Sequence, residues 1–348
     1  MTKSRQTSVF FLWLLVFYLV SCFYLIPLIP DKIIDSNSNF NIIFGQMLII
    51  IPVFLYVIVT KGRPLKELKF KRIGILNTFL LFVLTYCMIP VVSLLNIITM
   101  MFTTNRVSGQ LDSMSDNSFL LNLFLVAILP AVVEEITFRG IIYSGYRNST
   151  IKRAMLASAL MFGLFHMNIN QFCYAFFMGI VFVLVREATG SMHSSMIMHF
   201  IFNANSLVLL KLLDILTTYV NKMAKNDEGF AELADELNQT TNQTVATYTD
   251  YPLSEKLTTI VSLLLVAAFA GVLGFFVLRV IADRCNRLKH FNQILCSIVG
   301  KTPKDREVIR QNEYVESNTG EYGGKIVDFV FVLGIVLCVL MIIYIEIR

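Results

Sequence analysis

The chain has 348 residues, of which 56% are hydrophobic and 15% are charged, and its net charge is +5. Soluble domains are about half apolar and about one quarter charged. With a mean hydropathy of +0.68, the composition argues against a large soluble protein and favours a membrane protein with several spans. No stretch has the character of a nucleic-acid-binding patch. The six scattered cysteines lack CxxC spacing, which disfavours a disulfide framework or a zinc finger.

The apolar stretches predict an all-α, polytopic membrane helix bundle of about nine transmembrane helices around a buried hydrophilic cavity. A span needs about 20 mostly apolar residues. The N-terminal apolar run is too long for a signal peptide and is predicted to be a retained first span. The fifth and sixth spans should form a tight hairpin, because only "MNIN" separates them. The predicted spans are residues 8–30, 39–60, 74–102, 118–146, 151–167, 170–187, 190–214, 256–281 and 326–346.

The loops between the spans predict the orientation of the chain. Cytoplasmic loops are enriched in Lys and Arg. The basic stretches "MTKSR", "KGRPLKELKFKR" and "GYRNSTIKR" share one side if the N-terminus is cytoplasmic. Residues 222–255 would then lie outside the membrane on the other side, where a short amphipathic helix is expected. Residues 282–325 are predicted to form a basic, polar cytoplasmic loop.

The stretch "VVEEITFRG" places three ionisable residues inside an apolar segment. Such groups are costly in a membrane and indicate a functional site. Glu134 and Glu135 are neighbours, so on a helix their side chains point about 100° apart. Glu135 and Arg139 are four residues apart and can pair on one face. The pairing predicts that Glu134 faces a cavity, although all three residues could also form a simple ion-pair contact between helices.

Two later segments each carry a histidine with a companion on the same helix face. In "MFGLFHMN", Phe162 and His166 are four residues apart, and Gly163 between them would allow a close helix contact. In "SSMIMHFIFNAN", His199 and Asn203 have the same spacing. Either histidine could instead make a hydrogen bond that only serves packing.

Four other polar residues have weaker claims to a site. Arg186 and Glu187 in "REATG" lie at a predicted cytoplasmic helix end, where a solvated charge pair is expected. His193 lies near a helix start at the membrane interface and is left out of the candidate site. Asn205 is a further, weaker candidate for the cavity.

Together the candidate residues suit hydrolysis of an amide without a covalent intermediate. A carboxylate and a neutral imidazole can hold and deprotonate a water, and a second histidine with an amide donor can stabilise an oxyanion. The same side chains could hold a divalent metal such as zinc, with His166, His199 and Glu134 as ligands. The sequence lacks a HExxH motif, so the choice between no cofactor and a metal stays open.

The motifs EExxxR, FxxxH and HxxxN, in this order on successive apolar helices, resemble the CPBP family of intramembrane proteases. This is the CAAX-protease and bacteriocin-processing, or Abi, family, which includes the type II CAAX prenyl endopeptidases. The resemblance implies that Glu134 and His166 activate the water, and that His199 and Asn203 line the oxyanion site or share a metal. The implied catalytic residues are Glu134, Glu135, His166, His199 and Asn203, with Arg139 and Phe162 in supporting positions.

The resemblance divides the chain into three regions. Residues 1–117 hold three spans, residues 118–214 form the catalytic core of four spans, and residues 215–348 hold the last two spans with their long loops. The expected function is hydrolysis of a peptide bond in a membrane-associated or lipidated peptide or protein, in a bacterial plasma membrane. Alternatives are a non-catalytic scaffold for a signalling partner and a proton-coupled transporter. The expected partners are lipid and a peptide or membrane-protein substrate, without nucleic acid.

Overall fold

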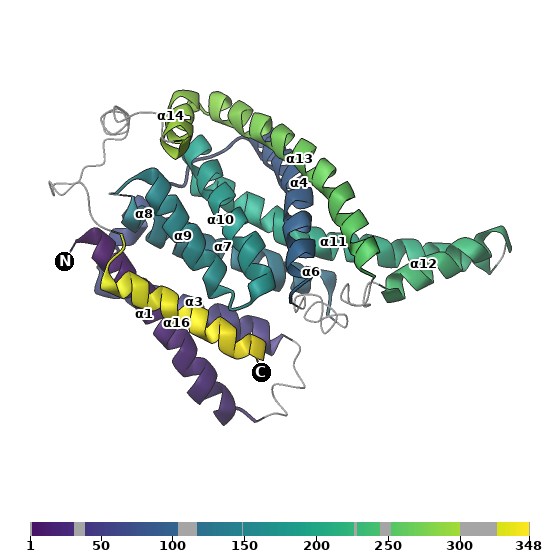
Figure 1. Ribbon diagram of the computed structural model, residues 1–348, viewed down its shortest axis with the longest axis horizontal. Helices are drawn as coiled ribbons and strands as arrows, with labels where there is room; N and C mark the ends of the chain where they lie inside the picture. Colours follow the sequence, from purple (N-terminus) through teal and green to yellow (C-terminus); the bar gives the residue numbers. More distant parts are fainter. Residues whose placement is uncertain are drawn as a thin grey trace.

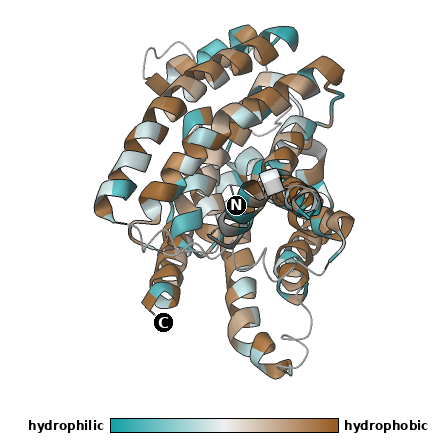
Figure 2. Ribbon diagram, turned by 90° about the vertical axis from the view of Figure 1, so that its right-hand side faces the viewer, coloured by the Kyte–Doolittle hydropathy of each residue, from teal (hydrophilic) through white to brown (hydrophobic). Residues whose placement is uncertain are grey.

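In the part of the chain that the structure describes, eight helices are long and apolar enough to cross a membrane. The computed structural model describes residues 2–30, 39–103, 117–147, 149–225, 228–243, 252–299 and 326–347. Within these ranges the regular structure is helical, without strands. The prediction of an all-α, multi-pass membrane protein is confirmed, while its orientation and its cellular membrane stay predictions. Figure 2 shows that hydrophobic residues cover most of the outer helices, as expected of surfaces that face lipid.

The N-terminal spans follow the apolar stretches closely. The first begins at α1 (Lys3–Val20) and continues through short π-helical and 3₁₀ turns to Leu28. The next two are α3 (Phe40–Val59) and α4 (Ile75–Thr99). Two C-terminal helices pack along them: α16 (Phe329–Ile347) lies beside α1, and α13 (Leu253–Arg284) lies beside α4 (Figure 1). The first and last helices of the chain are therefore neighbours, and α13 packs beside the third span.

The fourth span departs from a regular α-helix in two places. Its π-helical parts are η4 (Leu123–Ile128) and η5 (Glu135–Tyr143), which lie before and after α7 (Leu129–Glu134). The span begins at α6 (Phe119–Asn122) and ends at α8 (Ser144–Tyr146). Wider π turns are often found at functional sites, and here they fall around the two adjacent glutamates.

The predicted hairpin of the fifth and sixth apolar segments is present, but its first arm is short. The arms are α9 (Ile151–Phe165) and α10 (Ile169–Thr189), which pack along each other. With 15 residues, α9 is about 22 Å long, and the apolar core of a bilayer is about 30 Å thick. It is mostly buried inside the bundle. The described residues therefore hold eight helices long enough to span, and the predicted fifth span is a buried helix.

Gly179 lies at a close contact between α10 and α9. A Cβ atom at this position would lie 2.9 Å from both Cα and Cβ of Ala159. We expect Gly179→Ala to push the helices apart and lower the free energy of unfolding by about 1–3 kcal/mol, measured by denaturant unfolding in detergent. Gly271→Ala on α13 is the control, since its nearest neighbour would be 3.7 Å away. Equal stability of the two variants would contradict this account.

The seventh span is much longer than its apolar segment predicts. The helix α11 (Met192–Ala224) runs beyond the bundle, and α12 (Ala231–Gln243) folds back against it (Figure 1). Their amides pair in both directions: Asn221 Nδ2 donates to Asn238 Oδ1 at 3.2 Å, and Asn238 Nδ2 donates to Asn221 Oδ1 at 3.1 Å. The short helix predicted within residues 222–255 is confirmed.

A helix occupies part of the predicted cytoplasmic loop. The segment α14 (Leu288–Val299) buries Phe291 and Ile294 completely. Its apolar residues repeat at helical spacing, so one face packs onto α9, α10 and α13. The segment predicted as a basic, polar loop thus contains a packed helix between its flanking spans, and residues 300 to 325 lie outside the described residues.

Candidate active site

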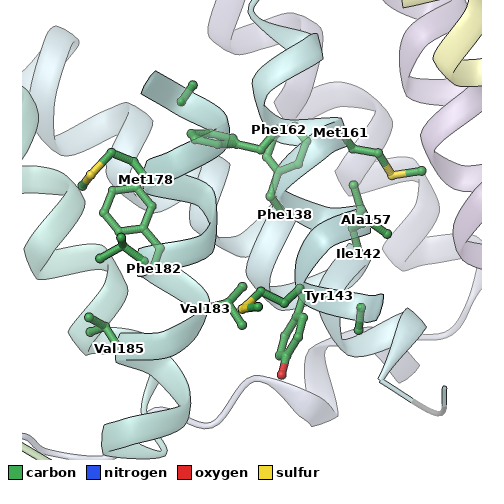
Figure 3. Close-up of a cluster of buried hydrophobic side chains, with 14 of the residues drawn as sticks. Phe138, Ile142, Tyr143, Ala157, Met161, Phe162, Met178, Phe182, Val183 and Val185 are labelled. Carbon is green, nitrogen blue, oxygen red and sulfur yellow. The ribbon is translucent and has the colours of Figure 1, made fainter. Parts of the chain in front are cut away.

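Glu135 and Arg139 form the buried ion pair that the sequence predicts. Arg139 NH1 lies 2.9 Å from Glu135 Oε1, and both side chains are fully buried. The guanidinium carbon lies 4.1 Å from the centroid of the Phe162 ring and 4.9 Å from that of Phe182. Figure 3 shows these two rings in one cluster with Phe138. Stacking on aromatic faces suits arginine, whose flat cation attracts the electron-rich ring.

His199 is held between the two glutamates. Its Nδ1 lies 3.2 Å from Glu135 Oε1, and its Nε2 lies 3.9 Å from Glu134 Oε2. Since an ionised carboxylate only accepts hydrogen bonds, Nδ1 carries a proton. The ring stacks on Phe182 with centroids 4.9 Å apart and an interplanar angle of 20°. These contacts orient Nε2 toward Glu134.

His166 terminates α9 and is fixed by the same helix. Its Nδ1 lies 2.8 Å from the carbonyl oxygen of Phe162. A carbonyl oxygen can only accept, so Nδ1 donates, and in the neutral ring Nε2 keeps its lone pair. The Phe162 ring meets the imidazole edge at a centroid distance of 4.9 Å. The four-residue spacing therefore lets Phe162 orient the imidazole of His166. The carbonyl oxygen of Phe162 accepts from Nδ1, and its ring packs against the imidazole.

Asn203 is positioned by a backbone group that a proline leaves available. Pro130 has no N–H, so the α-helical hydrogen bond to the carbonyl of Val126, four residues earlier, cannot form. Asn203 Nδ2 donates to this carbonyl at 3.2 Å. The bond ties α11 to η4 and directs the amide toward the fourth span. Pro130 thus leaves a carbonyl acceptor that Asn203, from another span, occupies.

One cavity brings the candidate residues together. It has a volume of about 460 Å³ and lies among α3, α4, α7, α10 and α11. Glu134 retains 14% of its side-chain exposure, whereas neighbouring Glu135 has none. The different directions predicted for the two glutamates are therefore confirmed. The predicted site residues on its lining are Glu134, Phe162, His166, His199, Asn203 and Asn205.

The lining does not present a metal site. Among the described residues, no group of three His, Cys, Asp or Glu side chains is placed to hold a metal ion. The ligand set considered from the sequence, Glu134, His166 and His199, thus does not fit a metal as these side chains lie.

Arg186 and Glu187 are buried rather than solvated, so the predicted solvated pair is wrong. Their exposed fractions are 5% and 3%. Arg186 NH1 donates to the carbonyl oxygen of Arg139, and Arg186 NH2 donates to Ser144 Oγ at 3.0 Å. Arg186 thereby binds the backbone of η5, in which Glu135 and Arg139 lie. This contact connects the end of α10 to the segment that carries the buried ion pair.

Glu187 is the anion at the centre of a cluster of cations. Its carboxylate accepts from Tyr143 Oη at 2.9 Å and Arg147 NH2 at 3.0 Å, and it contacts His290 Nε2 at 2.8 Å and Arg287 NH2 at 3.6 Å. Sequence reasoning missed Arg147, Arg287 and His290. These partners lie between 40 and 103 residues from Glu187 in the chain, so no spacing could indicate them.

Burial and neighbouring charges both shift the pKa of the cations around Glu187. Burial lowers the pKa of Arg287, while the charge of Glu187 opposes that shift. The pKa of Lys69 is lowered as well, first by burial and then by the charge of Arg147. Glu187 is therefore the counter-ion that allows several cations to sit together beside α14.

Glu187→Ala should destabilise the fold and release α14. The change leaves Arg147, Arg287 and His290 facing one another without their anion, and breaking a buried pair costs about 3–5 kcal/mol. We expect a loss near 3 kcal/mol, because Arg147 and Arg287 are partly exposed and can still reach water. Denaturant unfolding in detergent measures the loss, and limited proteolysis detects the release of α14.

The control for Glu187→Ala is Asp214→Ala. Asp214 pairs with Lys211 on the outer surface of α11, with side-chain exposures of 61% and 49%. An exposed pair contributes about 0–1 kcal/mol, so this variant should unfold almost like the wild type. If Glu187→Ala unfolded no more readily than Asp214→Ala, the cluster would not stabilise the bundle.

A comparison with protein families matches one part of the chain. Residues 116–205 match the family model described as type II CAAX prenyl endopeptidase Rce1-like. This segment includes all three motifs and the predicted site residues that line the cavity. The predicted resemblance is therefore confirmed for residues 116–205. No curated protein and no solved structure matches the chain.

Proposed function

We propose that this membrane protein is an intramembrane endopeptidase that hydrolyses a peptide bond of a membrane-associated or lipidated peptide or protein. One observation carries the proposal: Glu134 on α7, His166 at the end of α9, and His199 with Asn203 on α11 line one cavity, while Glu135 is buried in an ion pair. The family match of residues 116–205 supports peptidase chemistry in this segment.

The first step is attack by a water molecule held between Glu134 and His166. Each side chain offers a hydrogen-bond acceptor to the water. Glu134 offers its carboxylate, and His166 offers Nε2, because the Nδ1 proton of His166 is bound to the Phe162 carbonyl. Glu134 takes a proton as the water oxygen bonds to the carbonyl carbon of the substrate, and the carbonyl π electrons move to its oxygen. His166 accepts a hydrogen bond from the other O–H of the water and so directs the lone pair of the water oxygen toward the carbonyl carbon of the substrate.

The resulting oxyanion is stabilised by His199 and Asn203. Asn203 uses one Nδ2 hydrogen for Val126 and keeps the other for the oxyanion. His199, whose Nδ1 is bound to Glu135, lies on the same lining and donates to the oxyanion from Nε2 when that nitrogen carries a proton. Collapse of the intermediate then breaks the C–N bond, and the proton on Glu134 passes to the leaving nitrogen. The immediate products are a carboxylic acid and an amine, and transfer of the acid proton to the amine gives a carboxylate and an ammonium group.

Purified protein, reconstituted in lipid nanodiscs, tests the proposal with a library of internally quenched fluorescent peptides. Mass spectrometry identifies the cleaved bond, and metal analysis of the same sample determines whether the active protein carries a metal. Glu134→Ala is the matched inactive variant. Cleavage by the wild type and its loss in the variant support the proposal. Equal cleavage by both would contradict it, and binding without cleavage, unaffected by the variant, would favour the scaffold alternative.

A further inference from the structure

The turn between α9 and α10, residues 166–168, begins at His166 and has an unfavourable backbone conformation. Met167, the residue after His166, has a φ of +52° and is only 3% exposed. Left-handed backbone is costly for a residue with a side chain, and such a conformation persists only where surrounding contacts hold it. The position of His166 in the cavity therefore depends on what fixes this turn to the rest of the bundle.

Asn170, in the first turn of α10, binds the end of α4. Its Nδ2 atom has two hydrogens, and it donates to Asn96 Oδ1 at 2.8 Å and to Thr99 Oγ1 at 2.9 Å. Asn170 is 1% exposed, and burial strengthens such bonds because water does not compete for them. Since α4 lies outside the segment of residues 116–205 that matches the family, the turn after His166 is held by a separate region of the chain.

The other hydrogen bonds around the turn hold it less firmly to the bundle. Asn168 Oδ1 accepts from Gln171 N at 2.9 Å, and this bond caps α10 within the hairpin itself. Ile169 N donates to Glu346 Oε1 of α16 at 3.4 Å, in an exposed position. The bonds of Asn170 are shorter than the bond to α16 and are buried. They are therefore the main polar connection between the turn and a helix outside the hairpin.

We propose that Asn170 is a positioning residue for His166: by tying the turn to α4, it keeps Nε2 of His166 directed at the attacking water. The inference rests on the proposed peptidase function. Asn170 is not part of the cavity lining, so it acts through His166 and does not touch the substrate. Loss of the tie lets the imidazole move relative to Glu134, and a displacement of about 1 Å in a catalytic group can cost about 10²-fold in rate.

The first experiment is Asn170→Leu, which removes the amide but keeps a side chain of similar shape. We expect kcat for a peptide cleaved from the quenched library to fall about 10- to 100-fold, with KM within about twofold. The reason is that the geometry of attack is lost while the surface that binds the substrate is unchanged. Wild-type kcat in Asn170→Leu would overturn the proposal.

The matched control is Asn221→Leu on α11. Asn221 also joins two helices through its amide, with bonds of 3.2 and 3.1 Å to Asn238, but it is not part of the cavity lining. Its kcat and KM should equal those of the wild type. A fall in kcat as large as that in Asn170→Leu would show that loss of any interhelical amide lowers the rate, and would overturn the specific role of Asn170.

Thr99 provides a milder variant that tests the same tie from α4. Thr99→Val removes the hydroxyl that accepts from Asn170 and keeps the shape of the side chain, so kcat should fall in the same direction. Thr99→Ser retains the hydroxyl and should restore wild-type kcat. Equal rates in Thr99→Val and Thr99→Ser would contradict the proposal. This pair also gives the answer if Asn170→Leu does not fold.

A double variant distinguishes positioning from a general loss of stability. Asn170→Leu should not lower the residual single-turnover rate of His166→Ala any further, since Asn170 acts only through His166. A general loss of stability would lower both rates by the same factor. A further fall of about tenfold in the double variant would therefore overturn the proposal.

Hydrogen exchange, followed by mass spectrometry, tests the tie without a substrate. The amides of His166 and Met167 bond to carbonyls of α9, and they should exchange faster in Asn170→Leu, whereas those of α12 should not change. Unchanged exchange in the turn would overturn the proposal even if kcat fell. If the wild type cleaves no peptide, the proposed function itself fails, while exchange still determines whether Asn170 holds the turn.

Discussion

Glu134→Gln lowers kcat by at least about 10³-fold, while KM and the denaturant midpoint stay close to those of the wild type. This result is expected because a general base contributes about 10²–10⁴ to the rate, and an amide cannot accept the proton of the water. The side chain reaches into the cavity, and its nearest ionic contact is 3.9 Å away, at His199 Nε2. The fold therefore depends little on it. Single-turnover cleavage of the library peptide measures the effect.

His166→Ala should behave like Glu134→Gln, since it removes the other acceptor of the water. Glu255→Gln, on the exposed start of α13, is the control and should retain full activity. A Glu134→Gln protein that cleaves within tenfold of the wild-type rate would remove Glu134 from the role of base. The role would then have to pass to His166 alone.

Arg139→Met is the change with the largest expected effect on stability, a loss of about 3–5 kcal/mol. It leaves Glu135 as a fully buried carboxylate without its cation, and it removes the guanidinium from between the rings of Phe162 and Phe182. Denaturant unfolding in detergent measures the loss. Methionine keeps most of the side-chain volume, so a cavity contributes little to the result.

The double variant Glu135→Met, Arg139→Met distinguishes the effect of an unpaired buried charge on stability from the effect of changed side-chain packing. Removing both partners also removes the unpaired charge, so the double variant should recover much of the stability lost in Arg139→Met. Its activity should still fall, because His199 loses the acceptor for its Nδ1 proton. A double variant less stable than either single variant would show that the pair stabilises the bundle by more than mutual neutralisation.

The fold was predictable where a long apolar segment decides the structure. Nearly all of the spans follow from hydropathy, because a membrane leaves the backbone few alternatives to a helix. The exceptions have physical reasons. α9 is apolar but too short to span, and it is buried by protein rather than lipid. α14 has a mixed composition, and its buried face becomes visible only when Phe291 and Ile294 are placed against the bundle.

The candidate site was predictable where its geometry is local. Pairs four residues apart on one helix, such as Glu135 with Arg139, follow from helical periodicity. Contacts between helices do not, and these include the stacking of His199 on Phe182 and the bonds of Asn170 to α4. Glu187 is a similar case. Its position at a predicted helix end suggested exposure to solvent, but residues from distant segments, such as His290, pack against it and it is buried.

The hydrogen bond from Asn203 to Val126 makes two distant positions depend on each other. Asn203 is useful in the site only while the Val126 carbonyl is free, and that carbonyl is free because residue 130 is a proline. An alanine at residue 130 would supply the missing backbone donor and compete for the carbonyl. Pro130 and Asn203 are therefore energetically coupled, so the effect of Pro130→Ala on the site should depend on whether Asn203 is present.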